Sequence, residues 1–252
     1  MARLAIIAAM FREVHPLVRK WEPKRYLLDR RVQLYQSDAA VVAYAGMGPE
    51  SAQVACKAAL AVGETSALIS VGWAGGLNAN TSAGQVVQPE TVVDAVSGRR
   101  YKGGGTQGTL VSVQLVADTE EKRRLAERYR GDFVDMEAAT VAAYAQEAGL
   151  PFYALKAISD AHDARLPDMN RFNRNGRFQT WKFLAYLALR PGLWQLIADM
   201  SRASLDSRDV LCKQLEEMIA KETQERSRPR SDFDLQGPPA ENPAEGGRAP
   251  VS

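Results

Sequence analysis

The sequence predicts an α/β domain, in which a central sheet is flanked by helices and is followed by extra helices toward the C-terminus. Short apolar runs of strand length alternate with amphipathic or alanine-rich segments of helix length, which is the pattern of such a sheet. The chain has 252 residues, of which 46% are hydrophobic and 25% charged, enough to bury one sizeable core. We therefore expect one principal domain over residues 1–166.

The strands of this domain are expected where apolar runs end at Gly, Pro or polar turn residues. Residues 4–9 form a continuous apolar run, which is typical of a central strand buried on both faces. The other expected strands are residues 32–35, 39–45, 67–71, 85–93, 109–116, 133–135 and 152–158. Helical spacing or composition predicts helices at residues 50–62, 120–129 and 136–148.

The pattern changes after Pro167. Three successive helices are expected, over residues 177–189, 192–203 and 206–222, and no strand is expected among them. This helical part, residues 167–222, is expected to pack on the core or to flank it. Residues 223–252 are rich in Pro, Gly, Ser, Arg and Glu, so they cannot offset their ordering entropy and are expected to be a disordered tail.

Composition excludes several classes of partner. A net charge of +2 and a pI near 8.5 give no reason to expect nucleic-acid binding. Cys56 and Cys212 are the only cysteines and there are two histidines, which argues against a disulfide framework and against a Cys/His metal site. The apolar run at residues 4–10 is too short for a signal peptide, and no run reaches membrane-span length, so a cytoplasmic protein is expected.

Three carboxylate positions follow strand-like runs: Glu13, the pair in Asp135-Met136-Glu137, and Asp160. A single carboxylate after a strand is more often a helix cap or a solvated turn residue. Their recurrence is more informative, because open α/β sheets place ligands at strand ends. The sequence therefore indicates a site built mainly from carboxylates.

Residues 4–172 resemble the nucleoside phosphorylase and nucleosidase superfamily, most closely the methylthioadenosine/S-adenosylhomocysteine nucleosidases. The resemblance rests on four features in order: Ala-Met followed by Glu13-Val14, the turn Ala45-Gly46-Met47-Gly48, the loop Gly72-Trp73-Ala74-Gly75-Gly76-Leu77, and Asp135-Met136-Glu137-Ala138 followed by Ala157-Ile158-Ser159-Asp160. It implies a three-layer fold with a mixed, twisted central sheet. It also implies a homodimer that cleaves the N-glycosidic bond of a purine nucleoside without a metal or a cofactor.

The resemblance also implies a role for each site residue. Asp160 looks like the general acid that protonates the departing base, with Ser159 orienting it, and Glu13 looks like the base that activates water. Glu137 looks like the acceptor of the ribose hydroxyl hydrogen bonds, with Met136 packed against the sugar. Gly75 and Gly76 belong to the substrate-binding loop, where glycine permits close approach of a ligand to the backbone.

Asp160 has to carry a proton when it acts. We therefore expect its surroundings to favour the protonated form, with an apolar pocket and the carboxylates Glu13 and Glu137 nearby. Lys156, earlier in the same strand, would act against this if its side chain pointed inward.

Two departures from the family pattern bear on specificity. Trp73 replaces a small residue of the loop, and its bulk would either narrow the sugar site or pack into the core. Residues 111–116 lack the aromatic side chain that stacks on the base in nucleosidases. Phe172 and Phe152 are the candidates to replace it, and Phe152 is the more typical of a core residue.

The nucleophile stays open between water and phosphate. The turn Gly46-Met47-Gly48-Pro49 resembles phosphorylases more than nucleosidases, and Arg12, Arg99 and Arg100 are candidates for a phosphate site. A non-catalytic nucleoside-binding or membrane-docking protein is a third alternative, suggested by Trp73 and the missing stacking residue. The complete set of carboxylates argues against it.

Basic and aromatic residues alternate between residues 171 and 194, which is typical of a segment that docks on an anionic membrane or that covers a sheet or a dimer interface. The motif Arg190-Pro191-Gly192-Leu193, together with the two glycine motifs, resembles the hopanoid-associated members of the superfamily. Those members are linked to the removal of adenine from adenosylhopane. The resemblance therefore implies a 5′-modified, lipid-linked adenosine as substrate and a peripheral membrane contact.

Overall fold

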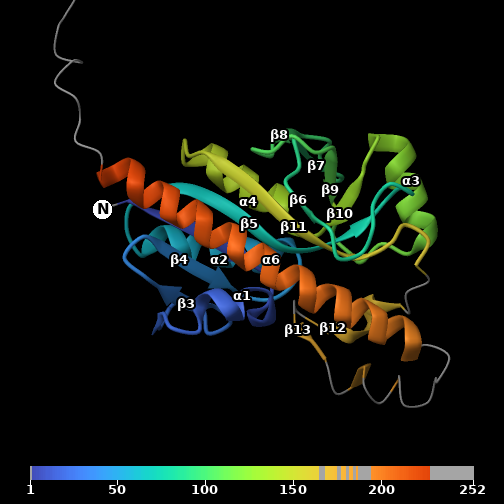
Figure 1. Ribbon diagram of the computed structural model, residues 1–252, viewed down its shortest axis with the longest axis horizontal. Helices are drawn as coiled ribbons and strands as arrows, with labels where there is room; N and C mark the ends of the chain where they lie inside the picture. The colour runs from blue at the N-terminus through green and yellow to red at the C-terminus, as the bar shows by residue number, and fades with distance from the viewer. Residues whose placement is uncertain are drawn as a thin grey trace, which may run out of the picture.

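A computed structural model describes residues 2–164, 168–174, 177–179, 182–183, 186 and 194–227. It contains one large mixed sheet with helices on both faces, which confirms the expected α/β fold (Figure 1). The strands of this sheet are β1 Arg3–Ala8, β2 Glu22–Lys24, β3 Gln33–Gln36, β4 Ala40–Tyr44, β5 Thr65–Gly76, β6 Val86–Val87, β7 Thr91–Asp94, β8 Arg100–Lys102, β9 Thr109–Ser112, β10 Phe133–Asp135 and β11 Phe152–Asp160. The helices are α1 Phe11–Val18, α2 Pro49–Ala61, α3 Thr119–Tyr129, α4 Ala138–Glu147 and α6 Trp194–Ser227.

The topology of the sheet brings four strand ends to one edge. The strand order is β2-β3-β4-β1-β5-β10-β9-β7-β8, and β11 pairs with β5 and β6. Strands β4, β1, β5 and β11 are mutually parallel, so their carboxyl ends lie at the same edge. Strand β10 runs antiparallel to β5 and pairs Phe133 with Gly76, which directs the residues after Asp135 back along β5. Carboxylates from distant parts of the sequence therefore converge on one strand.

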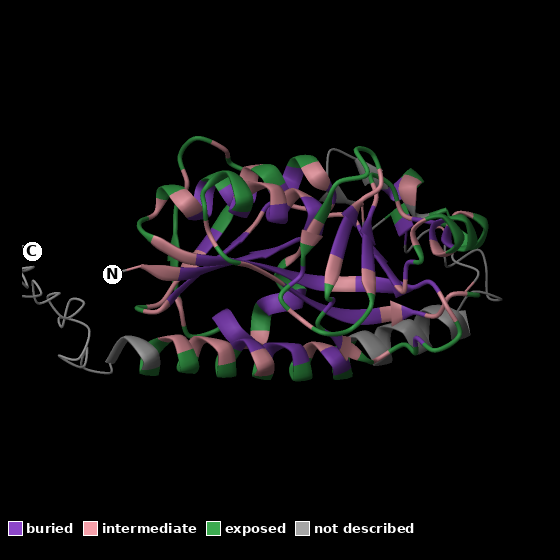
Figure 2. Ribbon diagram, turned by 90° about the horizontal axis from the view of Figure 1, so that it is seen from above, coloured by how far each residue is buried: buried purple, intermediate pink, exposed green. Residues whose placement is uncertain are grey.

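Strand β1 is buried on both faces, as its continuous apolar sequence predicts. Leu4, Ile6 and Ala8 belong to the core beneath α1 and α6, whereas Ala5 and Ile7 belong to the core beneath α2. In Figure 2 the long helix α6 lies along one side of the sheet with its buried residues facing inward. The three expected layers are therefore present.

Several elements differ from the expected ones. Strand β5 continues through Gly76, so the glycine segment is part of the strand rather than a loop after it. The expected strand at 85–93 is divided into β6 and β7 around Pro89, which cannot donate a ladder hydrogen bond. Helix α1 and the three-residue strands β2 and β8 were not anticipated, because segments this short carry little periodicity.

The C-terminal prediction is partly wrong. The helices expected at 192–203 and 206–222 are one continuous helix, since α6 runs from Trp194 to Ser227 without a break at Ser204. It also extends past residue 222, so the tail cannot begin at 223; residues 228–252 lie outside the described part. A short hairpin of β12, Asn173–Arg174, and β13, Arg177–Phe178, replaces the start of the helix expected at 177–189, and most of that range also lies outside the described residues. No described helix is long and apolar enough to cross a membrane.

Candidate active site

The last residues of β5 form the floor of the candidate site. A Cβ atom added to Gly72 would lie 3.0 Å from Glu13 Oε1, and one added to Gly75 would lie 3.2 Å from Asp160 Oδ2. The two glycines are three residues apart on an extended strand, or about 10 Å. Glycine is therefore required at both positions because carboxylate groups pack directly on the strand.

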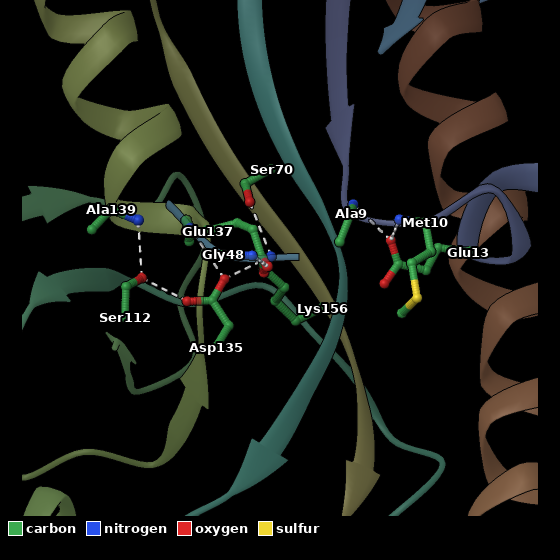
Figure 3. A network of polar contacts seen from close by, with 11 residues as sticks. Ala9, Met10, Glu13, Gly48, Ser70, Ser112, Asp135, Glu137, Ala139 and Lys156 are labelled. Carbon is green, nitrogen blue, oxygen red and sulfur yellow. Dashed lines mark hydrogen bonds and ion pairs between the residues drawn. The ribbon is translucent and has the colours of Figure 1, made fainter. Parts of the chain in front are cut away.

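Glu13 lies in the first turn of α1, immediately after β1. Its Oε2 accepts hydrogen bonds of 2.9 Å from the backbone N–H groups of Ala9 and Met10, which stabilises the start of the helix (Figure 3). The residue is buried, with 3% of its surface exposed, and burial raises the pKa of its carboxyl group. A raised pKa suits a general base that has to take a proton near neutral pH.

Glu137 immediately precedes α4 and faces the turn before α2. Its Oε1 accepts a 2.7 Å hydrogen bond from Gly48 N–H. The side chain of Met136 lies on the same turn, because a Cβ atom added to Gly48 would be 3.6 Å from Met136 Cε. Burial, followed by the nearby charge of Asp135, raises the pKa of Glu137 to about 7.

Lys156 connects these carboxylates and is completely buried. Its Nζ lies 2.8 Å from Asp135 Oδ2 and donates a 2.9 Å hydrogen bond to Ser70 Oγ (Figure 3). Desolvation lowers its pKa, but the charges of Asp135 and Glu137 outweigh this and raise the pKa overall, so the lysine is charged. The Lys156 side chain therefore points inward, but it forms its ion pair with Asp135 rather than with Asp160.

Asp135 serves mainly to hold this arrangement together. Its Oδ1 accepts a 2.6 Å hydrogen bond from Ser112 Oγ, and its Oδ2 accepts one of 2.9 Å from Ala138 N–H at the start of α4. Ser112 Oγ in turn accepts from Ala139 N–H at 2.9 Å. Strands β9 and β10 are thereby joined to the end of α4 that carries Glu137.

Asp160 is placed by a β-bulge at the end of β11. The register with β5 shifts between Ile158 and Asp160, and a bulge of this kind redirects side chains. Ser159 Oγ lies 2.5 Å from Asp160 Oδ1 and 3.2 Å from the carbonyl oxygen of Ala74, so its hydroxyl can donate to either. The orienting role expected for Ser159 agrees with this contact.

The predicted surroundings of Asp160 did not include the charged partner that the structure shows. Its Oδ2 forms an ion pair with Lys122 Nζ, and only 2% of the Lys122 side chain is exposed. Lys122 is not among the residues predicted for the site, although Lys122 and Leu125 share the buried face of α3, where a lysine is unusual.

The remaining expected site residues lie in different places. Gly75 contacts the Asp160 carboxylate, whereas a Cβ at Gly76 would be 3.0 Å from Thr81 Cγ2. Phe172 is buried, and its ring contacts those of Phe183 and Tyr186 edge-on at 5.3 and 5.2 Å. The Arg171 guanidinium also lies 5.5 Å from the centre of this ring.

Trp73 does not lie on the face that holds the Lys156 network. It is partly buried in the core shared with α1 and α6, and the Arg12 guanidinium lies 4.6 Å above its ring. Successive residues of a strand point to opposite faces, so Gly72 turns toward Glu13 while Trp73 turns away. Of the two outcomes expected for Trp73, packing into the core is the one observed.

Comparison with known families agrees with this arrangement. The sequence profile of the phosphorylase superfamily matches residues 3–109 and 106–180. The chain belongs to this superfamily. It is therefore an enzyme, and the resemblance of its motifs to the superfamily is confirmed. A search of curated proteins found no match.

Members of known structure share the fold at low sequence identity. 5′-Methylthioadenosine nucleosidase from Arabidopsis thaliana superposes with a TM-score of 0.66 at 18% identity, covering 92% of this chain and 99% of that one. The 5′-methylthioadenosine/S-adenosylhomocysteine nucleosidase of Helicobacter pylori and the futalosine hydrolase of Helicobacter pylori each give 0.65 at 16% identity, covering 87% of this chain and 98% of theirs. These superfamily members thus share the α/β fold seen here.

The site consists of carboxylates, lysines, serines and backbone groups. Among the described residues, no group of three or more His, Cys, Asp or Glu side chains is arranged to hold a metal ion. Two buried cations, Lys122 and Lys156, lie against two different carboxylates. Such an arrangement can transfer protons and can stabilise a positive charge that develops on a bound sugar.

Proposed function

We propose that this enzyme hydrolyses the N-glycosidic bond of a purine nucleoside. Asp160 protonates the base, Glu13 takes a proton from the attacking water, and Glu137 accepts hydrogen bonds from the ribose hydroxyls. The water oxygen bonds to the anomeric carbon, the C–N bond breaks, and its electron pair stays with the base. Membership of the superfamily and the fold shared with nucleosidases support this assignment.

One observation carries the proposal. Three carboxylates from elements distant in sequence lie at the glycine end of β5: the buried Glu13 beside Gly72, the buried Asp160 beside Gly75, and the partly buried Glu137, which follows the strand β10 that pairs with Gly75 and Gly76. Carboxylates in desolvated surroundings at the end of a sheet strand are typical of a functional site, and burial raises the pKa of both Glu13 and Glu137. Cleavage with a protonated leaving group and an oxocarbenium-like sugar uses an acid, a base and an anion near the ring.

Water is favoured over phosphate by the environment of the turn before α2. Gly48 N–H, at the amino end of that helix, is where an anion would bind. It donates to Glu137, which places a carboxylate at that position. Arg12, a candidate phosphate ligand, lies over Trp73 instead. Both contacts support hydrolysis rather than phosphorolysis.

The test is release of free base from adenosine, 5′-methylthioadenosine and inosine, with and without inorganic phosphate. We expect release that is independent of phosphate and a free sugar as the second product. A phosphate-dependent rate with a sugar 1-phosphate product would replace hydrolysis with phosphorolysis. Binding of nucleosides without release of base from any of them would contradict enzymatic cleavage altogether.

We propose further that the substrate is a 5′-modified adenosine, with the lipid-linked nucleoside adenosylhopane as the candidate suggested by motif resemblance. A homodimer in the cytoplasm that makes peripheral contact with the membrane would fit such a substrate. The test is co-sedimentation of the full chain with anionic and neutral liposomes, with light scattering for the oligomeric state. Absence of binding to both kinds of liposome would remove the reason for a lipid-linked substrate.

A further inference from the structure

Lys122 is a buried charge that the reaction as written does not use. Helix α3 is otherwise a charged surface helix: the Arg123 and Arg124 side chains are 60% and 68% exposed and pair with glutamates of the same helix. The Lys122 side chain is 2% exposed and turns inward. Its Nζ contacts Asp160 Oδ2 and donates a 2.7 Å hydrogen bond to the Ala161 carbonyl oxygen.

The ion pair is enclosed and separate from the Lys156 network. A Cβ atom at Gly75 would lie 3.2 Å from Asp160 Oδ2 and 3.3 Å from both Lys122 Cε and Val134 Cγ1. The ionisable groups on the elements around the pair have partners of their own. Asp118 accepts from Glu121 N–H, and the Glu121 side chain pairs with Arg124. Asp132 accepts from Asn78 and from Thr109 N–H, Asp135 pairs with Lys156, and the partly exposed His162 lies within 3.9 Å of Asp163. The Lys122–Asp160 pair is therefore a local unit.

Contacts across the loop after β11 hold α3 in this position. Thr119 Oγ1 donates to the Ala164 carbonyl oxygen at 3.4 Å. The Asn170 side chain accepts from Val116 N–H at 2.8 Å and donates to the Val116 carbonyl oxygen at 3.0 Å. The segment before α3 and the segment after Asp160 are thereby joined at several points, so the lysine is directed at the carboxylate by the surrounding structure.

This geometry raises a question about the source of the proton. A general acid must deliver a proton, and the hydrogen-bond donors that contact the Asp160 carboxylate are the Lys122 ammonium group at Oδ2 and the Ser159 hydroxyl at Oδ1. We propose that Lys122 is a positioning residue that supplies this proton to Asp160. The inference rests on the proposed function and deepens it.

The transfer is balanced within the pair and solvent. As the C–N bond breaks, a proton moves from Lys122 Nζ to the Asp160 carboxylate while Asp160 passes a proton to the purine nitrogen, which keeps the bonding electron pair. Lys122 is left as a neutral amine and takes up a proton from water once the base has departed. The proton taken from the attacking water leaves separately, through Glu13.

The test compares kcat against pH for the wild type, Lys122→Met, Lys122→Arg and Arg123→Met, with one nucleoside that the wild type cleaves. Without the lysine, the proton must reside on the Asp160 carboxyl group itself. The alkaline limb of the Lys122→Met profile should therefore move toward acid by more than about one pH unit. Arginine keeps the charge but does not release its proton, so Lys122→Arg should lower kcat about 10²–10⁴-fold at every pH.

Arg123→Met removes the same charge from the exposed side of the helix and should leave the profile unchanged. Circular dichroism of each variant establishes that it is folded, and Lys122→Arg retains the buried charge if the methionine variant does not fold. An unshifted profile in Lys122→Met, or wild-type kcat in Lys122→Arg, overturns the relay while hydrolysis by the wild type stands. Failure of the wild type to release base from any nucleoside overturns both proposals.

Discussion

Each carboxylate of the candidate site has a different local environment, as the different roles proposed for the three would require. Glu13 is bonded to backbone N–H groups, Glu137 to Gly48, and Asp160 to a serine and a lysine. Acidic residues in identical environments would be interchangeable, whereas these three residues are not. Substitution of each should therefore produce its own effect on rate or on pH dependence.

Asp160→Asn should lower kcat by about 10²–10⁴-fold while the protein stays folded, because general acid catalysis contributes about that much. The amide keeps the shape and the contact with Ser159 but cannot donate an acidic proton. Steady-state release of free base measures the effect. A kcat within a few-fold of wild type would remove Asp160 from the reaction.

Glu137 should make stability depend on pH. Its pKa is about 7 in the folded protein and close to its ordinary value in the unfolded chain, so the folded state binds a proton more tightly. This contribution to stability is present at acid pH and is lost as the pH rises through about 7. In urea unfolding, Glu137→Gln should lose less stability than wild type between about pH 5 and 8.

The control for this experiment is Glu217→Gln, which changes an exposed glutamate on α6 and should follow the wild-type dependence. A pH dependence in Glu137→Gln that equals that of wild type would show that Glu137 ionises normally.

At the scale of elements, β5 and α6 have separate tasks. Strand β5 carries the carboxylates on its glycine end, and α6 covers the face of the sheet opposite α2 and α4. Under the proposed function, β5 supports the reaction and α6 supports stability. Substitutions on β5 should change rate and stability together, and substitutions on the inner face of α6 should change mainly stability.

Gly75→Ala should reduce kcat about tenfold or more and destabilise the fold by about 1–3 kcal/mol, the usual cost of overpacking. The new methyl group would meet the Asp160 carboxylate, Lys122 and Val134 at 3.2–3.3 Å, so the ion pair has to move. Kinetics and thermal unfolding of the purified variant measure the two effects. If neither kcat nor the stability changed, the Lys122–Asp160 pair would have room for the added methyl group.

Leu215→Ala should destabilise the protein by about 2–5 kcal/mol, because it leaves a cavity between α6 and the sheet. Leu215 is fully buried in that core, whereas Leu205 on the same helix is 51% exposed. Leu205→Ala is the matched control and should change stability by less than about 0.5 kcal/mol. Equal losses in the two variants would mean that α6 does not cover the core as described.

At the scale of the whole molecule, the described C-terminal helix is part of the folded unit. Leu211, Cys212 and Leu215 pack in the same core as β1 and α1, and Cys212 Sγ lies 3.5 Å from the Glu13 carbonyl oxygen. The helix therefore supports the segment that carries Glu13, the proposed general base. We therefore expect truncation to reduce stability once it removes residues of α6, which ends at Ser227.

Removal of residues 228–252 should leave the melting temperature and kcat unchanged, since their composition offers little apolar surface to bury. Truncation after Ser204 removes the α6 residues of the core and should abolish cooperative unfolding. Differential scanning calorimetry of the two truncated proteins distinguishes these outcomes. A large loss of stability on removal of 228–252 would mean that this segment packs on the domain.

Patterns in the sequence were enough to predict the fold class, the central position of β1 and the superfamily to which the chain belongs. These follow from hydrophobic periodicity and from short motifs, both of which are local. Only the tertiary structure decided that the glycine segment continues β5, that Trp73 turns away from Glu13, that Lys156 pairs with Asp135, and that Lys122 reaches Asp160. The physical reason is that Lys122 and Asp160 are 38 residues apart, and contacts between such distant residues depend on packing geometry that no local pattern specifies.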